Sequence, residues 1–173
     1  MRYLAIILIG FFILMPQSAW ARCISGNCDN GYGTYIYDSG NKYIGSYKRG
    51  LMSGRGTFIW ANGNKYQGQW SRDYANGQGT YSYANGDRYV GQWGNDVKSG
   101  QGTMYWADGS KYVGEWAYDK KEGHGKNTYA SGDVYMGQWR NDLKHGKGLY
   151  IWNNGRRLEG EWLDGNEVLK SPH

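Results

Sequence analysis

Four aspartates recur at one position of successive sequence units, and metal binding is the first chemistry that they suggest. Asp73, Asp96, Asp119 and Asp142 are each 23 residues from the next. A row of carboxylates could attract Ca²⁺, which takes about six to eight oxygen ligands. Equivalent positions on stacked hairpins lie about 10 Å apart, however, too far to share one ion, and Asp is a common turn residue. We therefore predict no metal site and no cofactor.

Two histidines are further candidates for acid–base chemistry. His124 lies inside one Gly-x-Gly motif and His145 precedes another, so they occupy different positions of the repeat. Neither has a Ser or Cys nucleophile motif nearby. Catalytic acids and bases need a unique arrangement with unequal environments, whereas the four aspartates occupy equivalent positions. We predict surface histidines, no catalytic residues and no enzyme.

Residues 1–21 have the pattern of a secretory signal peptide. Arg2 supplies a positive charge, residues 3–15 are almost uninterruptedly apolar, and Ala19-Trp20-Ala21 has the small-x-small pattern of a cleavage site. The alternative is an uncleaved membrane anchor, but a helix of 13 residues spans only about 20 Å of a hydrocarbon core about 30 Å thick. We predict export to the periplasm or the cell exterior, with N-terminal membrane anchoring as the alternative.

Export decides the interpretation of the two cysteines, Cys23 and Cys28. Disulfides persist in oxidising compartments, and this pair would close a short loop just after the predicted cleavage site. A redox site more often has CxxC spacing. A zinc site needs four ligands, which the histidines do not complete at any recognisable spacing. We predict a disulfide between Cys23 and Cys28.

Aromatic residues at a fixed spacing are the chain's candidates for binding. A Tyr-x-Gly-x-Trp motif begins at residues 43, 66, 89, 112, 135 and 158, with Tyr47 in place of the first Trp and Leu158 in place of the last Tyr. Rings left open in a groove can anchor a polypeptide, stack on a sugar or meet a lipid interface. The predicted binding residues are the rings of the four complete central motifs: Tyr66, Trp70, Tyr89, Trp93, Tyr112, Trp116, Tyr135 and Trp139.

Two further signals keep the same 23-residue period and define a β-hairpin. A Gly-x-Gly motif, such as Gly77 and Gly79, opens each unit, and a turn dipeptide such as Asn85-Gly86 follows before the Tyr-x-Gly-x-Trp motif. Gly supplies the positive φ that tight hairpin turns require, and Asn tolerates it. Each unit is therefore predicted to be a strand, a turn, a strand and a connecting loop.

Alternation along the strands places the rings on one face. Tyr89, Gly91 and Trp93 share a face, with Arg88 and Gln92 on the other. The glycines would leave space for rings from adjacent strands, which predicts an aromatic face floored by glycine. Six hairpins give about twelve antiparallel strands and a length of about 55–60 Å. We predict an all-β fold, an elongated, twisted, single-layer antiparallel sheet of about six stacked hairpins.

The repeat leaves no room for a separate catalytic domain. It is expected to occupy residues 31–165 of the 173-residue chain. Residues 22–30 form a short N-terminal segment with the cysteine pair, and residues 166–173 form a C-terminal tail.

The charge of the chain is modestly positive and scattered. Its formal net charge is +5, and removal of residues 1–21 would leave +4, because that segment holds Arg2 and no acid. The basic residues make no run of five or more. We predict no nucleic-acid binding.

These motifs resemble the MORN (membrane occupation and recognition nexus) repeat, whose pattern joins Tyr-x-Gly-x-Trp to Gly-x-Gly and a turn glycine. The similarity covers residues 31–165. The chain departs from the family pattern in carrying Asp where the family often has Gly three positions after the Trp, and in replacing a strand ring by Asn127. The resemblance implies an extended sheet that serves protein association, self-association or contact with membrane phospholipid.

A non-catalytic interaction or scaffold module of the cell envelope is the functional prediction. The predicted binding rings serve first to pack neighbouring hairpins, but a single-layer sheet cannot bury both faces, so part of the aromatic face should stay open as a groove. Protein partners or a second copy are the expected ligands. A carbohydrate or envelope polymer held by aromatic stacking is one alternative, and peripheral binding to anionic phospholipid is another.

Overall fold

The computed structural model describes residues 21–168, where every regular element is a β-strand. All but the last residue of the predicted signal peptide, residues 1–21, lie outside the described residues. Within the described part, no helix is long and apolar enough to cross a membrane.

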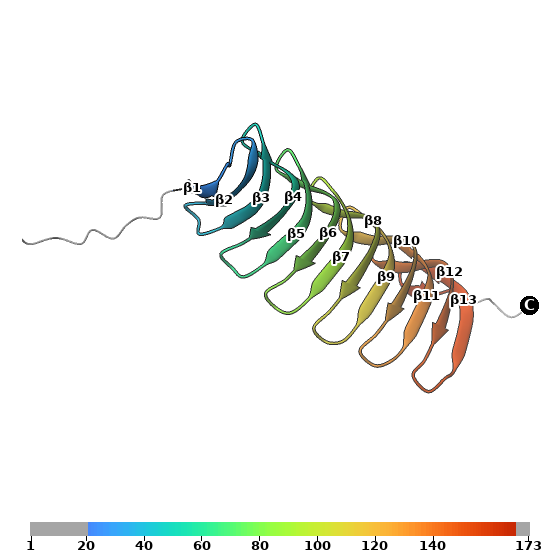
Figure 1. Cartoon of the computed structure of the whole chain (residues 1–173). Coiled ribbons are helices and arrows are strands. Elements are labelled where there is room, and N and C mark those ends of the chain that lie inside the picture. Colours follow the sequence, from blue (N-terminus) through green and yellow to red (C-terminus); the bar gives the residue numbers. More distant parts are fainter. Residues whose placement is uncertain (1–20, 169–173) are drawn as a thin grey trace, which may run out of the picture.

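One antiparallel sheet of fourteen strands contains all the strands, in the order of the chain. The strands are β1 (Arg22–Gly26), β2 (Gly31–Ile36), β3 (Lys42–Lys48), β4 (Leu51–Ile59), β5 (Lys65–Ser71), β6 (Tyr74–Ser82), β7 (Arg88–Gly94), β8 (Val97–Tyr105), β9 (Lys111–Ala117), β10 (Lys120–Thr128), β11 (Val134–Arg140), β12 (Leu143–Ile151), β13 (Arg157–Leu163) and β14 (Asn166–Glu167). Figure 1 shows them as an elongated stack of curved hairpins with β1 and β13 at opposite ends of the array. The predicted sheet of stacked hairpins is confirmed, and β1 and β14 add one strand at each end.

Each hairpin turn is closed by its own backbone, and four of the turns are also hydrogen-bonded to the preceding turn. In the third repeat, the Tyr83 N–H donates to the Asp87 carbonyl at 2.9 Å, and Gly86 has a φ of 97°. The next contact crosses between hairpins, where the Ala84 N–H donates to Asn64 Oδ1 at 2.9 Å. Equivalent bonds to Asn41, Asp87 and Asp133 repeat this link.

A bulge bends the strands where one hairpin pairs with the next. Between β5 and β6, Gly68 pairs with Gly79 and Trp70 pairs with Ala75, so residues 76–78 face a single residue of β5. The side chain of that residue accepts a backbone N–H of the bulge at 2.6 Å. Extra residues on one strand bend it and increase its local twist. Similar register shifts at the other junctions curve every unit alike.

Paired glycines form the floor on which the tyrosines lie. The ring of Tyr66 covers Gly68 and Gly79, and a Cβ at Gly79 would lie 2.3 Å from the Tyr66 Oη. That hydroxyl donates to the Gln69 carbonyl at 3.0 Å. The predicted structural role of the glycines is confirmed, because any larger residue would displace the ring.

Tyrosine and tryptophan alternate along the whole array as one continuous core. Tyr66 meets Trp70 of its own strand at 5.0 Å between ring centroids and Trp93 of the next hairpin at 5.2 Å, both edge to face. Each central tryptophan also donates through Nε1 to a glycine carbonyl, as Trp93 does to Gly79 at 3.3 Å. We call this row, from Tyr43 to Trp162, the aromatic ladder. It joins neighbouring hairpins into one core.

Candidate binding groove

The structure brings the eight predicted binding rings together on one face but buries them. The tyrosines Tyr66, Tyr89, Tyr112 and Tyr135 are at most 1% exposed, and the tryptophans Trp70, Trp93, Trp116 and Trp139 are 4–8% exposed. Burial raises the pKa of Tyr135 to about 12 and raises that of the other three tyrosines further. These rings pack the hairpins, and their direct contact with a ligand stays a prediction.

A second row of rings stands above the ladder and is only half-buried. It lies just before the hairpin turns, at Tyr37, Trp60, Tyr83, Trp106, Tyr129 and Trp152. Trp60 packs at a tilt against Phe58, with 4.6 Å between ring centroids, and against Tyr81 of the next hairpin, with 5.2 Å. Sequence reasoning did not select this row as a site. The signal was present, because an aromatic residue precedes each turn at the same 23-residue period.

In the first repeats, an apolar groove is lined by rings such as Trp60 and by residues near the other end of the strands, such as Met52 and Ala75. One cavity of about 330 Å³ is lined by Met52, Phe58, Trp60, Ala75 and Tyr81, among others. A second, of about 520 Å³, lies toward the N-terminal end and shares Met52 and Phe58 with the first. We call the two together the N-terminal groove. Its lining is mostly aromatic and aliphatic, as in many ligand sites.

In the later repeats, lysines occupy the position that Met52 and Ala75 hold in the first repeats. The residues that pair with the last ring of each Tyr-x-Gly-x-Trp motif are Met52, Ala75, Lys98, Lys121 and Lys144. Each ammonium group lies over aromatic rings. The shortest distances to a ring centroid are 4.7 Å for Lys98, 4.5 Å for Lys121 and 5.0 Å for Lys144. Partial burial lowers the pKa of each lysine, and nearby carboxylates oppose the shift. We call the three residues the lysine row.

Sequence reasoning missed the lysine row although its signal is periodic. The three lysines are 23 residues apart, like the rings. Their place on the aromatic face follows from the register between hairpins, where Lys98 pairs with Trp93.

The four recurring aspartates accept backbone hydrogen bonds, and two of them, Asp73 and Asp96, also line the N-terminal groove. Asp96 lies in a loop with a φ of 69°, and its Oδ1 accepts the Ala75 N–H at 2.7 Å. In return the Asp96 N–H donates to the Ala75 carbonyl at 3.0 Å. Asp73, Asp119 and Asp142 repeat the bond to the preceding repeat. Within residues 21–168, no three His, Cys, Asp or Glu side chains are grouped to hold a metal.

The histidines lie apart from one another. His124 Nδ1 is 3.8 Å from Glu115 Oε1, and 74% of the His124 side chain is exposed. His145 Nδ1 is 3.9 Å from Asp164 Oδ1, at a different point of the repeat. Neither histidine lines the N-terminal groove.

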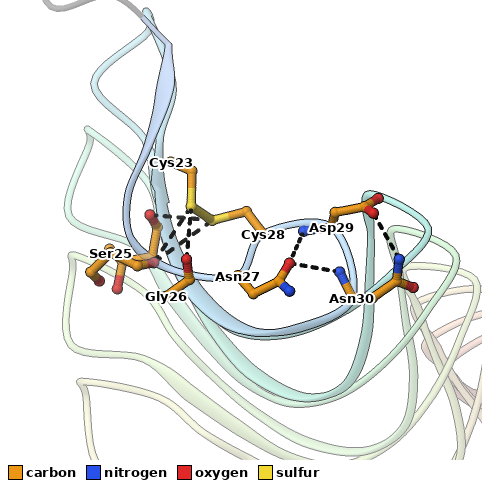
Figure 2. Close-up of a disulfide and its surroundings, with 8 residues drawn as sticks. Cys23, Ser25, Gly26, Asn27, Cys28, Asp29 and Asn30 are labelled. Atoms are coloured by element: carbon orange, nitrogen blue, oxygen red, sulfur yellow. Dashed lines mark hydrogen bonds between the residues drawn. A yellow bond between two sulfur atoms is a disulfide. The ribbon is translucent and has the colours of Figure 1, made fainter.

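The cysteine pair forms the predicted disulfide at the N-terminal end of the sheet. Cys23 and Cys28 are joined across the loop that links β1 to β2 (Figure 2). A Cβ at Gly33 would lie 2.8 Å from the Cys28 sulfur. Gly33 pairs with Gly45, so the disulfide covers the first glycine of the floor where later repeats use a tyrosine. It therefore caps the end of the aromatic ladder.

An open antiparallel array in which each 23-residue hairpin pairs with the next defines a repeat protein of the solenoid type. The family model described as "MORN repeat" matches residues 30–42, 43–65, 66–88, 89–111, 112–134 and 135–156. The chain belongs to the MORN repeat family, as its motifs had predicted. No curated protein sequence matches it.

The chain is similar to two solved structures. The TCP domain of SAS-4 (dCPAP) of Drosophila melanogaster, in complex with a proline-rich motif of Ana2 (dSTIL), is 13% identical, with 99% of each chain covered and a TM-score of 0.48. The G-box domain of the microcephaly protein CPAP is 11% identical, with 76% of this chain and 68% of that chain covered and a TM-score of 0.50. At 11% identity, the similarity to the G-box domain concerns the fold alone.

Proposed function

We propose that this chain is a non-catalytic interaction module of the cell envelope that binds a polypeptide along its aromatic face. The polypeptide is a protein partner or a second copy of the chain. The N-terminal groove is the observation that carries this proposal. Its apolar walls include Met52, Phe58 and Trp60, and the packed rings of the aromatic ladder lie beneath them. A groove already held in shape binds with less loss of conformational entropy.

The use of the polar residues supports a role other than catalysis. The recurring aspartates, such as Asp96, accept backbone N–H groups and sit in equivalent environments. An acid–base pair needs environments that separate the pKa values of its two members. The envelope location rests on the predicted signal peptide.

Carbohydrate binding is the second candidate. The half-exposed indoles of Trp60 and Trp106 lie 46 residues apart along the same wall and offer flat faces for a sugar ring. The aliphatic part of the lining favours a polypeptide. Met52 and Ala75 line the cavity opposite Trp60, and aliphatic side chains of that kind pack best against apolar side chains of a ligand.

Placing a cation in the N-terminal groove tests the proposal. Ala75→Lys and Met52→Lys should each abolish retention of a polypeptide captured from the native cell envelope and identified by mass spectrometry. The fold should accept both changes, because Lys98, Lys121 and Lys144 occupy the same position in later repeats. A lysine at either position fills part of the cavity and places its charge against the apolar side chains of the ligand, which lowers the affinity.

Ala117→Lys is the matched control. Ala117 is on the opposite face of β9, and the equivalent residue of the first repeat, Lys48, shows that the position accepts lysine. Retention should be unchanged in this variant. The proposal fails if wild-type protein retains no polypeptide and sediments as a monomer, or if the groove variants retain the captured polypeptide as well as the control does. Retention of envelope polysaccharide alone would favour the second candidate.

A further inference from the structure

We propose that the aromatic face binds a two-part polypeptide, with apolar residues in the N-terminal groove and acidic residues at every third position along the lysine row. This inference rests on the proposed function and names the chemistry of its ligand. The division follows one structural position through the repeats, which holds Met52 and Ala75 first and Lys98, Lys121 and Lys144 afterwards.

The three lysines of the row are half-buried and form no salt bridge within the described part of the chain, although carboxylates lie near enough to oppose the lowering of their pKa values. Among residues 21–168, none of the three ammonium groups lies within salt-bridge distance of an acidic group. Lys121 lies against Trp106, Tyr112 and Trp139, and it donates to Asn127 Oδ1 at 3.2 Å. A cation removed from part of its water and left unpaired gains most from an anion that enters the same space. The surroundings of the lysine row therefore favour an acidic ligand.

The row ends within the described part of the sheet. At the next equivalent position, Glu167 pairs with Trp162, so the sign of the charge reverses after Lys144. The cationic part of the face thus spans three repeats, and a ligand should match it with three acidic residues.

The spacing of the row selects the conformation of the ligand. Equivalent residues of successive hairpins are two strands apart, which is about 9.4–9.8 Å. A polyproline-II chain rises about 3.1 Å per residue with three residues per turn, so every third side chain lies on the same side about 9.3 Å further on. A β-strand places residues three apart on opposite faces. Acidic residues at every third position of a polyproline-II segment would therefore meet successive lysines.

A polypeptide fits both halves of the face better than a lipid or a polysaccharide. A membrane surface attracts cations that stand free in water, whereas these ammonium groups lie against aromatic rings. A polysaccharide lacks the aliphatic side chains that the cavity lined by Met52, Phe58 and Ala75 would take. Only a polypeptide supplies apolar and acidic side chains on one backbone at the required period.

Selection from a displayed library of random peptides, about 15 residues long, tests the inference. Such a peptide in the polyproline-II conformation spans about 47 Å, enough for the five positions from Met52 to Lys144. Peptides selected by the wild-type protein should carry Asp or Glu at every third position of one half and apolar residues in the other. Selection of peptides without this acidic period would overturn the inference.

Variants that remove the positive charges of the lysine row test whether that row binds the selected peptide. In the combined variant Lys98→Met, Lys121→Met and Lys144→Met, a selected peptide should bind about tenfold more weakly or worse, with a flatter dependence on salt. Met keeps an unbranched apolar stem over the rings, so the fold is retained. The combination Lys98→Arg, Lys121→Arg and Lys144→Arg keeps the charge and should keep binding.

The matched control removes three lysines from the opposite face. Lys120, Lys126 and Lys147 are exposed there, and changing all three to Met alters the net charge equally. Binding should stay within about twofold of wild type, with little change in the electrostatic contribution at physiological salt. An equal loss in both triple variants would overturn the inference, as would competition by phosphatidylserine vesicles or polyglucuronate that depends on the lysine row. If Ala75→Lys abolishes peptide binding while the Lys-to-Met triple does not, the proposed function stands and this inference fails.

Discussion

At the residue scale, aspartate in the inter-hairpin loops replaces glycine and adds a bond that glycine lacks. Gly50 and Gly165 occupy the loop position in the end repeats, each with a positive φ and a backbone N–H that donates to the carbonyl 21 residues earlier. Asp96 keeps that backbone bond and adds its carboxylate as an acceptor for the Ala75 N–H. Asp tolerates the left-handed region better than most residues. The row that first suggested metal binding therefore fastens one repeat to the next.

The Asp96 position separates backbone strain from hydrogen bonding. Asp96→Asn keeps an acceptor and tolerates a positive φ, so the free energy of unfolding should stay close to wild type. Asp96→Gly loses the side-chain bond, which should cost about 1–2 kcal/mol. Asp96→Ala loses the bond and also strains the backbone, so it should cost about 1–2 kcal/mol more than Gly. Urea unfolding followed by circular dichroism measures the series.

Glu159→Ala serves as its control, since Glu159 is an exposed strand residue. It should leave the free energy of unfolding within about 0.5 kcal/mol of wild type. An Ala variant at position 96 as stable as wild type would show that the carboxylate contributes nothing.

At the element scale, the hairpin could be predicted from local signals but its exposure could not. Asn85-Gly86 fixes the turn, and the alternation around Tyr89 and Trp93 fixes the faces. Trp93 is covered by Tyr66 of the preceding hairpin, and that contact depends on the bulge and twist between hairpins. Lys98 reaches the aromatic face through the same register. Contacts between hairpins therefore determine which of the predicted rings are buried. No motif within a single hairpin specifies those contacts.

The disulfide should stabilise one end of the array and leave the middle unaffected. The strand β1 is exposed throughout and pairs only with β2. Closing so short a loop contributes about 2 kcal/mol by the chain-entropy relation. In the double variant Cys23→Ser, Cys28→Ser, hydrogen exchange measured by mass spectrometry should speed up across β1 and β2.

The central strands provide the internal control for this variant. Exchange in β6 to β11 should match that of the oxidised wild-type protein, because each repeat depends mainly on its neighbours. Faster exchange through the whole sheet would contradict a local role. Reduced wild-type protein should behave like the double variant.

At the scale of the whole molecule, the aromatic ladder links stability to the protonation of buried tyrosines. Tyr43, Tyr66, Tyr89 and Tyr112 have pKa values raised well above the ordinary value by burial, and that of Tyr135 is raised to about 12. Each hydroxyl also donates to a backbone carbonyl, as Tyr89 does to Gln92 at 3.0 Å. The folded sheet therefore keeps the protons of these five tyrosines above about pH 10, where an unfolded chain releases them.

This linkage predicts steep unfolding in alkali. Below about pH 10 both states keep the protons, and the stabilisation is fully present. As pH rises further, the unfolded state binds fewer protons, so the free energy of unfolding falls by about 1.4 kcal/mol per pH unit for each tyrosine, or about 7 kcal/mol for five. Typical domain stabilities are about 5–15 kcal/mol, so the sheet should unfold within about two pH units. Tyrosinate absorbance and circular dichroism should change together.

Tyr66→Phe supplies the quantitative check on this account. The variant loses the bond to the Gln69 carbonyl and should be about 1 kcal/mol less stable at neutral pH. Above about pH 10, however, one linked proton is gone, so its free energy of unfolding should fall less steeply than that of wild type, by about 1.4 kcal/mol per pH unit. Ionisation of the ladder tyrosines while the circular dichroism of the sheet persists would contradict the linkage, because it would show that a buried tyrosinate can be held within the folded array.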